Sequence, residues 1–368
     1  MIAAHAPIQR PRDAKLLVIH AHGTLTHASR RCLPALLRSG DLVVANDAAT
    51  LPASLIGVHV ESREPVEVRL AQRRSLAPDD VAEFGAIVFG EGDYRTPTEQ
   101  RPPPPPLASG DTLRLGPLRA TVQRMLGHPR FVALRFEGSM LEIWRGIALH
   151  GRPIQYAYVP APLALWDVWT RIAAVPAAFE PPSAGFVLDW HLLGELRARE
   201  IAFATLTHAA GISSTGDAAL DALLPFDEPY DIPRDTAHAL ERARERGGRV
   251  IAVGTTVVRA LEAAAGDDGP VRPGADVARQ RIDARTRLRV VDALLTGTHE
   301  PGTSHHALLG AFATRESLQR ADRELAVHGY RTHEFGDSML IERANIALAS
   351  PASALTHSAR ASTMRVIA

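Results

Sequence analysis

Hydrophobic and polar positions along this 368-residue chain follow two different rhythms. In the first rhythm, continuous apolar runs of strand length are followed by amphipathic stretches with helical spacing. Runs without alternation are typical of strands that are buried on both faces. We expect strands at 16–19, 42–45, 201–208, 249–253 and 287–296, and helices at 29–37, 191–200, 236–246, 257–265 and 304–325. Such alternation of helix and strand predicts an α/β fold with a mostly parallel sheet flanked by helices.

The second rhythm occupies residues 56–150, where short strand-like runs follow one another without a long helical period. Gly, Pro and Asp separate these runs, which is the pattern of an antiparallel sheet or small barrel. The runs lie at 56–60, 65–70, 85–90, 111–115, 118–126, 130–136 and 140–145. We therefore predict an α/β domain made of residues 1–55 plus 151–368, interrupted by an inserted β-barrel-like domain at 56–150.

Composition narrows the class of protein. The 41 basic and 41 acidic residues give a formal net charge of zero, so any basic surface for nucleic acid must be local. Cys32 is the only cysteine, which rules out an intramolecular disulfide, and we expect it to be a buried thiol in a helix. No apolar run reaches signal-peptide or membrane-spanning length, which predicts a cytoplasmic protein without membrane contact. The sequence gives no signal for the oligomeric state.

The ends of three expected strands carry the candidate chemistry. Ligands of parallel α/β sheets bind outside the carboxyl ends of the strands, and this rule selects residues 206–208, 254–256 and 296–299. Gly254-Thr255-Thr256 precedes a helix, so its backbone N–H groups could hold a carboxylate or phosphate. A tight strand–helix turn capped by threonine explains the same residues equally well. No Walker loop and no dinucleotide-binding glycine motif occurs in the sequence.

The histidines of these strand ends admit more than one interpretation. His208 and His299 have the ordinary pKa for general acid–base work, although a loop histidine is more often a surface group. His299, His305 and His306 lack the spacing of known metal motifs, so we expect no metal. Ser183 does not lie in a nucleophile elbow, which argues against serine hydrolase chemistry.

Four segments resemble one known family, the S-adenosylmethionine:tRNA ribosyltransferase-isomerases of queuosine biosynthesis. They are GDLVVANDAATLPASLIG, GGRVIAVGTTVVRALEAAA, LRVVDALLTGTHEPGTSHHALLGAFA and YRTHEFGDSMLI, and the resemblance extends over about residues 13–341. It implies a two-domain fold with an inserted β-barrel. It also implies transfer and rearrangement of the ribosyl part of S-adenosylmethionine onto the 7-aminomethyl-7-deazaguanine wobble base of a tRNA anticodon stem-loop, giving epoxyqueuosine. S-adenosylmethionine is then a co-substrate, and no metal is required.

The resemblance also implies roles for individual residues. Polar or acid–base roles fall on His208, Glu228, His299 and Asp337. Contacts with S-adenosylmethionine fall on Gly254, Thr255, Thr256 and Arg259, with Ser183 and Gly185 shaping the pocket.

Several positions depart from the family pattern. Val187 and Phe226 stand where the family has histidines, and Gly297-Thr298 replaces Asn-Phe before His299. The family's His-Val-Gly-x-Gly-Thr-Phe is reduced to the segment 208–214, His-Ala-Ala-Gly-Ile-Ser-Ser. Two alternatives therefore stay open: a divergent S-adenosylmethionine-using paralogue with another acceptor, and a non-catalytic RNA- or nucleoside-binding relative.

Overall fold

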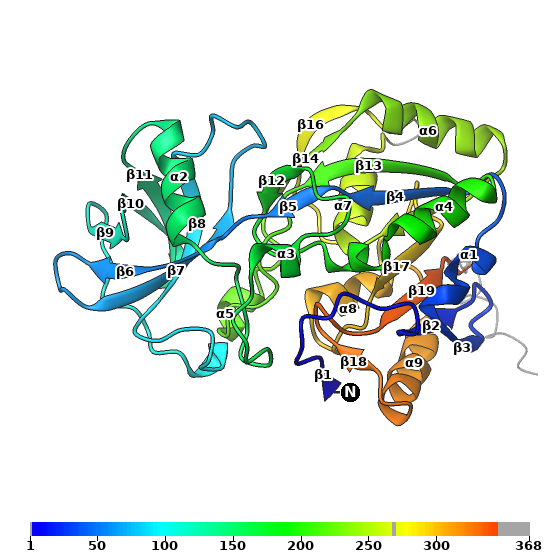
Figure 1. Cartoon of the computed structure of the whole chain (residues 1–368), viewed down its shortest axis with the longest axis horizontal. Coiled ribbons are helices and arrows are strands. Elements are labelled where there is room, and N and C mark those ends of the chain that lie inside the picture. Colours follow the sequence, from blue (N-terminus) through cyan, green and yellow to red (C-terminus); the bar gives the residue numbers. More distant parts are fainter. Residues whose placement is uncertain (1, 267–269, 345–368) are drawn as a thin grey trace, which may run out of the picture.

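The computed structural model describes residues 2–266 and 270–344, which form a layered α/β body joined to a smaller barrel (Figure 1). Within the described residues, the α/β body is built on a nine-stranded sheet. Its strands, in sheet order, are β16 (Gly274–Ala278), β14 (Glu228–Ile232), β13 (Ala202–His208), β4 (Leu42–Asn46), β15 (Val250–Val253), β17 (Ala293–Gly297), β19 (Ser338–Glu342), β2 (Lys15–Ile19) and β3 (Leu25–Ser29).

The expectation of a mostly parallel sheet is not confirmed, because the sheet is mixed. Parallel pairs join β13 to β4, β4 to β15, β15 to β17 and β19 to β2. The other four neighbouring pairs among the described strands are antiparallel. A parallel connection needs a crossover of a dozen or more residues, usually with a long helix. Between β13 and β14 the chain forms only α5 (Ala218–Asp221) and returns antiparallel.

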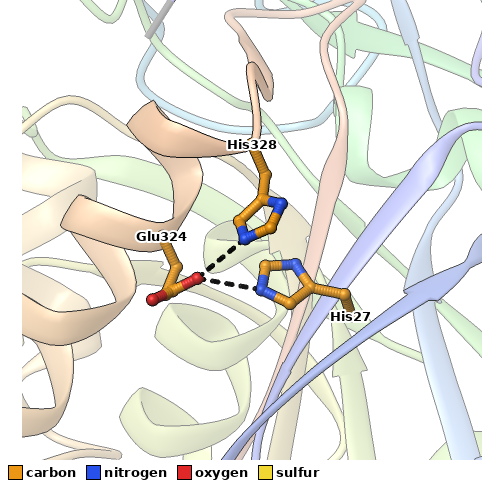
Figure 2. Close-up of side chains that lie close together, drawn as sticks. All are labelled: His27, Glu324 and His328. Carbon is orange, nitrogen blue, oxygen red and sulfur yellow. Dashed lines mark hydrogen bonds and ion pairs between the residues drawn. The ribbon is translucent and has the colours of Figure 1, made fainter.

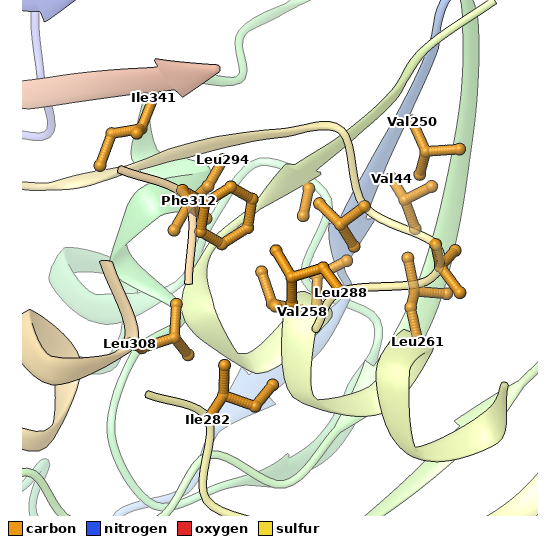
Figure 3. Packing of buried hydrophobic residues seen from close by; sticks show 14 of the residues in the cluster. Val44, Val250, Val258, Leu261, Ile282, Leu288, Leu294, Leu308, Phe312 and Ile341 are labelled. Atoms are coloured by element: carbon orange, nitrogen blue, oxygen red, sulfur yellow. The ribbon is translucent and has the colours of Figure 1, made fainter. Parts of the chain in front are cut away.

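Helices cover both faces of the sheet, as its doubly buried strands require. One face packs against α6 (Arg234–Glu245), α7 (Thr255–Ala264), α8 (Ser304–Leu309) and α9 (Arg315–Val327). Figure 3 shows this core, where Val258 and Leu261 of α7 lie close to Val44 and Val250 of the sheet. The other face packs against α1 (Leu33–Leu36), α4 (Trp190–Ala198) and the 3-10 turn η3 (Ser183–Val187).

Several local expectations for the α/β body are wrong. The strand expected at 287–296 is confined to β17, and the helix expected at 29–37 is reduced to a 3-10 turn followed by α1. The single helix expected at 304–325 is divided into α8 and α9, because Thr303 caps the first and Thr314 caps the second through their side-chain oxygens. Cys32 is exposed and ends the 3-10 turn η1 (Arg30–Cys32), so it is not the buried helical thiol that we expected.

The inserted antiparallel barrel is confirmed, and it is closed. Its strands, in order round the barrel, are β10 (Leu118–His128), β11 (Phe131–Phe136), β8 (Glu83–Phe89), β7 (Pro65–Gln72), β6 (Ser54–His59) and β9 (Thr112–Leu115). The strand expected at 140–145 is wrong, since α2 (Met140–His150) lies there. Ser139 and Glu142 form a capping box, and Ile143 and Ile147 are buried with the barrel core.

The connections between the sheet and the barrel contain β5 (Ala48–Thr50), α3 (Leu165–Val168) and β12 (Val175–Ala178), and β5 pairs with β12 in parallel. Of the other short elements, β1 (Ile2–Ala3) pairs with β18 (Arg331–Thr332), and η2 (Thr98–Gln100) lies between the barrel strands β8 and β9. In the described part of the chain, no helix has the length and apolar character needed to cross a membrane.

Candidate active site

A cavity of about 840 Å³ lies at the carboxyl ends of the central strands and reaches the barrel side at Pro97–Glu99. Residues that follow β13, β15 and β17 all line it, as do the Tyr156–Tyr158 segment and Glu334. Seven of the ten residues singled out from the sequence lie in its wall: Ser183, Glu228, Gly254, Thr255, Thr256, Arg259 and His299. The exceptions are Gly185, His208 and Asp337.

Gly254 connects β15 to the first turn of α7 with a backbone that only glycine adopts readily. Its φ of 100° and ψ of 152° lie in the region where other residues are strained. Thr255 and Thr256 begin the ten-residue helix α7 at the cavity wall. Their free backbone N–H groups and the helix dipole favour a negatively charged group at this point.

Asn46, at the end of β4, ties the strand ends together. Its amide donates to the His208 carbonyl at 2.9 Å and to the Thr256 hydroxyl at 3.4 Å. Its carbonyl oxygen accepts from the backbone N–H of His208, also at 2.9 Å. The Asn46 side chain therefore sets the spacing between the end of β13 and the start of α7.

His208, Glu228 and Arg259 form a buried group at the cavity wall, in which Glu228 and Arg259 line the cavity and His208 does not. One Glu228 oxygen accepts from the Arg259 guanidinium, and the other accepts from the Gly211 N–H at 2.6 Å. His208 Nε2 lies 3.5 Å from the Glu228 oxygen that accepts from Arg259. Among the described residues, neither ring nitrogen of His208 has a hydrogen-bond partner. Burial, followed by the positive Arg259, lowers the pKa of His208 well below its ordinary value. Burial therefore favours the uncharged form of the His208 ring, and His208 does not line the cavity.

His299 faces the cavity after β17. Its Nε2 lies 2.7 Å from the Thr296 hydroxyl, and its ring stacks on His305 at 5.1 Å between centroids. Removal from water, followed by the neighbouring His305, lowers the pKa of His299 well below its ordinary value. A neutral imidazole at this position can accept or donate a hydrogen bond to a ligand, but it is a weak base.

The remaining expected residues shape the wall from behind. Gly185 is buried, and a Cβ on it would lie 3.0 Å from the Thr170 methyl carbon. Asp337 accepts backbone N–H groups from Lys15 at 2.9 Å and Arg331 at 2.8 Å, so it organises the loops around it. Arg10 reaches from the N-terminal segment to the carbonyls of Gly336, at 3.0 Å, and Ser183.

Glu180 is the acid–base group that sequence reasoning missed. It follows β12, lines the cavity, and is only 6% exposed. The Tyr156 hydroxyl donates to its carboxylate. Burial, and then repulsion from Glu334, raises the pKa of Glu180 to about 7. A carboxyl with this pKa exchanges a proton near neutral pH, which suits a general base better than the two histidines do.

A cavity at the strand ends of an α/β body, with a few polar and ionisable side chains in its wall, is the arrangement of a small-molecule enzyme site. The family model described as queuosine biosynthesis protein matches residues 1–341, so the chain belongs to that family.

Several relatives match nearly the whole chain. The S-adenosylmethionine:tRNA ribosyltransferase-isomerase of Sorangium cellulosum is 34% identical over 362 residues, covering 93% of this chain and 95% of its own. The protein of the same name from Rhodopseudomonas palustris is 33% identical over 353 residues, covering 90% and 93%. The crystal structure of the S-adenosylmethionine tRNA ribosyltransferase from Thermotoga maritima has 25% identity and a TM-score of 0.48, covering 92% of this chain and 96% of that one.

Proposed function

We propose that this chain transfers and isomerises the ribosyl part of S-adenosylmethionine onto the 7-aminomethyl-7-deazaguanine base of tRNA, giving epoxyqueuosine. Family membership over residues 1–341 supports this function, as do the names of relatives that cover more than nine-tenths of the chain. The single structural observation that carries it is Glu180, an ionisable carboxyl with a pKa of about 7 in the wall of an 840 Å³ cavity.

The reaction needs a base that removes a proton from the carbon beside the sulfonium. We assign this role to the Glu180 carboxylate, since a base is most effective when its pKa lies near the working pH. The sulfonium charge beside a buried carboxylate also favours binding of the co-substrate. Adenine and methionine then leave, and the amine nitrogen of the base becomes joined to the rearranged sugar.

The N-terminal end of helix α7 supplies the proposed anion site for the co-substrate. We assign the methionine carboxylate of S-adenosylmethionine to the N–H groups that follow Gly254, with the Thr255 and Thr256 hydroxyls as further partners. Arg259 lies one turn along the same helix, but its guanidinium is committed to Glu228 and to the Ala278 carbonyl at 2.8 Å. Arg259 therefore supports the wall through Glu228 and the loop at Gly211.

His299 and Ser183 complete the proposed site. His299 offers a neutral imidazole to a ribose hydroxyl or to the incoming amine, with its ring held by Thr296. Ser183 shapes the pocket through its backbone, which Arg10 fixes. A tRNA anticodon stem-loop is the proposed partner, and with a net charge of zero its binding must rest on a few local arginines.

Two measurements test the proposed function. Isothermal titration should give saturable binding of S-adenosylmethionine to the purified chain. Incubation with hypomodified tRNA and S-adenosylmethionine should give epoxyqueuosine, detected by mass spectrometry of digested tRNA. Absence of the product beside an active relative under the same conditions would reject this acceptor.

A different acceptor is the second candidate, favoured by a specific position. Val187, where the resemblance expects histidine, is buried with Val253 in the apolar core on the η3 side of the sheet. Binding of S-adenosylmethionine without epoxyqueuosine formation would support such a paralogue. If S-adenosylmethionine does not bind either, a non-catalytic RNA- or nucleoside-binding protein is the remaining candidate.

A further inference from the structure

Three potential metal ligands meet on the surface of the α/β body, outside the wall of the cavity. His27 belongs to the edge strand β3, whereas Glu324 and His328 lie at the end of α9 (Figure 2). His27 Nε2 lies 3.2 Å from Glu324 Oε2, and His328 Nε2 lies 3.0 Å from the same oxygen. All three ligand atoms lie within 4.8 Å of one another. Two imidazoles and one carboxylate from two separate elements thus point at one small volume.

These separations match those of a metal coordination shell. Zinc binds imidazole nitrogen and carboxylate oxygen at about 2.0–2.2 Å, usually with tetrahedral geometry, so neighbouring ligand atoms lie roughly 3.3 Å apart. The two observed nitrogen–oxygen distances differ from this value by a few tenths of an ångström. The three side chains are between a third and a half exposed, which leaves room for water at the fourth position.

The surroundings hold two of the ligands in place. His27 Nδ1 lies 3.0 Å from the Tyr330 hydroxyl. When Nδ1 donates this bond, Nε2 keeps its lone pair directed at the cluster, as in the second shell of known metal sites. Lys15 donates to the carbonyls of His328 and Gly329 at 2.6 and 2.9 Å, which fixes the end of α9. Lys15 adds a positive charge nearby, so we expect binding of moderate strength.

Two other groups of similar residues lack these features. His59 meets Glu61 and Asp111, but Glu61 accepts the backbone N–H of Thr112, and Asp111 accepts that of Ala108 at 2.7 Å. These two carboxylates already accept hydrogen bonds from backbone N–H groups. His191 and Glu195 form an exposed pair at 3.2 Å on α4 and have no third ligand within the metal-type clusters of the described residues.

We propose that His27, Glu324 and His328 form a binding site for a late first-row divalent cation such as Zn²⁺. Imidazole-rich sites favour zinc and its neighbours, whereas Mg²⁺ prefers oxygen ligands. The bound ion bridges β3, the last strand of the sheet, to the end of α9. It therefore stabilises this edge of the α/β body, independently of the function proposed for the cavity.

Zinc titration of the untagged, chelator-treated full chain tests the site. With Mg²⁺ in excess, isothermal titration should give one saturable Zn²⁺ per chain with micromolar affinity. His27→Ala and His328→Ala should each weaken this binding at least tenfold, while the control His191→Ala leaves it unchanged. Zinc should raise the melting temperature of the native chain and of the control by a few degrees, and that of the two site variants by much less.

His328 lies exposed at a helix end, so His328→Ala should fold even if His27→Ala does not. Circular dichroism checks the fold of each variant. Zinc binding that survives both substitutions would overturn the proposal, as would the absence of a saturable step in the native chain. If a His59→Gln variant lost zinc binding while His27→Ala and His328→Ala still bound zinc normally, the ion would instead lie at the His59 group of the barrel.

Discussion

The Tyr156 hydroxyl donates a hydrogen bond to the carboxylate of Glu180 in the wall of the cavity. This bond stabilises the ionised form of Glu180, whereas burial and the negative Glu334 oppose it more strongly. The balance places the pKa of the carboxyl at about 7. The pH at which Glu180 takes up a proton thus depends on Tyr156, which precedes β12 in the chain, whereas Glu180 follows it.

Glu180→Gln should reduce the turnover of epoxyqueuosine formation at least a hundredfold, which is a typical contribution of a general base. In the native chain, turnover should rise with pH through about 7, because only the ionised carboxylate accepts the proton. Tyr156→Phe is the matched variant: it keeps the base but should move this rise to higher pH. A pH profile that is the same in all three proteins would contradict the assignment.

Glu180→Gln should also stabilise the folded chain in alkaline solution. The folded-state pKa of Glu180, about 7, lies above its ordinary value of 4.5, so ionisation costs folding free energy. This cost is absent below pH 4.5, grows as pH rises and is complete above 7, where it reaches on the order of 3 kcal/mol. Glu180→Gln should therefore raise the melting temperature at pH 8 by several degrees and change it little at pH 4. Thermal unfolding at both pH values checks this.

His299→Ala should cut turnover at least tenfold with little loss of stability, because the ring faces the cavity and its one described side-chain hydrogen bond is to Thr296. His306→Ala is a suitable control, since His306 contacts Asp322 on α9 and is absent from the cavity wall. Steady-state kinetics with calorimetry separates the two effects. Near-normal turnover in His299→Ala would remove this residue from the site.

Arg259→Met and Glu228→Gln should each destabilise the fold by about 3–5 kcal/mol, since each leaves one partner of a buried pair uncompensated. The double variant should be less destabilised than the sum of the two. Urea unfolding of the four proteins of this cycle measures the coupling. Strict additivity would show that the pair does not act as a unit.

Gly254→Ala should destabilise the chain by about 1–3 kcal/mol and weaken S-adenosylmethionine binding, because a side chain strains the backbone at φ 100°. Gly194→Ala is the control, since this helical glycine has nothing within 4 Å of an added Cβ and alanine favours a helix. Titration with S-adenosylmethionine compares the variants. Equal affinity in both would contradict the anion site at the start of α7.

Much of the architecture could be predicted because local patterns dominate it. The six barrel strands and the central strands β4, β13 and β15 all overlap predicted runs, although several extend past the predicted ends by one or two residues. The run at 140–145 misled, because MLEIWR has the apolar content of a strand while the capping box of Ser139 and Glu142 starts a helix. The mixed character of the sheet could not be predicted, since the direction of β14 and β19 depends on connections without a regular period.

The candidate site was only partly visible in the sequence. The rule that ligands bind at the carboxyl ends of strands predicted the segments at Gly254 and His299, because their position follows from the topology of the sheet. Glu180 lies in AAFEPPSAGF, outside any motif, and the one available signal was a lone carboxylate in an apolar run. Its pKa depends on Tyr156 and Glu334, which are distant in sequence and meet it only in the fold.

The position of the barrel within the chain orders the events of synthesis. All six barrel strands lie between Ser54 and Phe136, so the barrel can close as soon as that segment has left the ribosome. Strands β2 and β4 emerge earlier, yet their sheet neighbours β19 and β13 follow about 320 and 160 residues later. β2 can pair early with its other neighbour β3, but β4 and the second edge of β2 can complete the sheet only after the barrel segment has been synthesised.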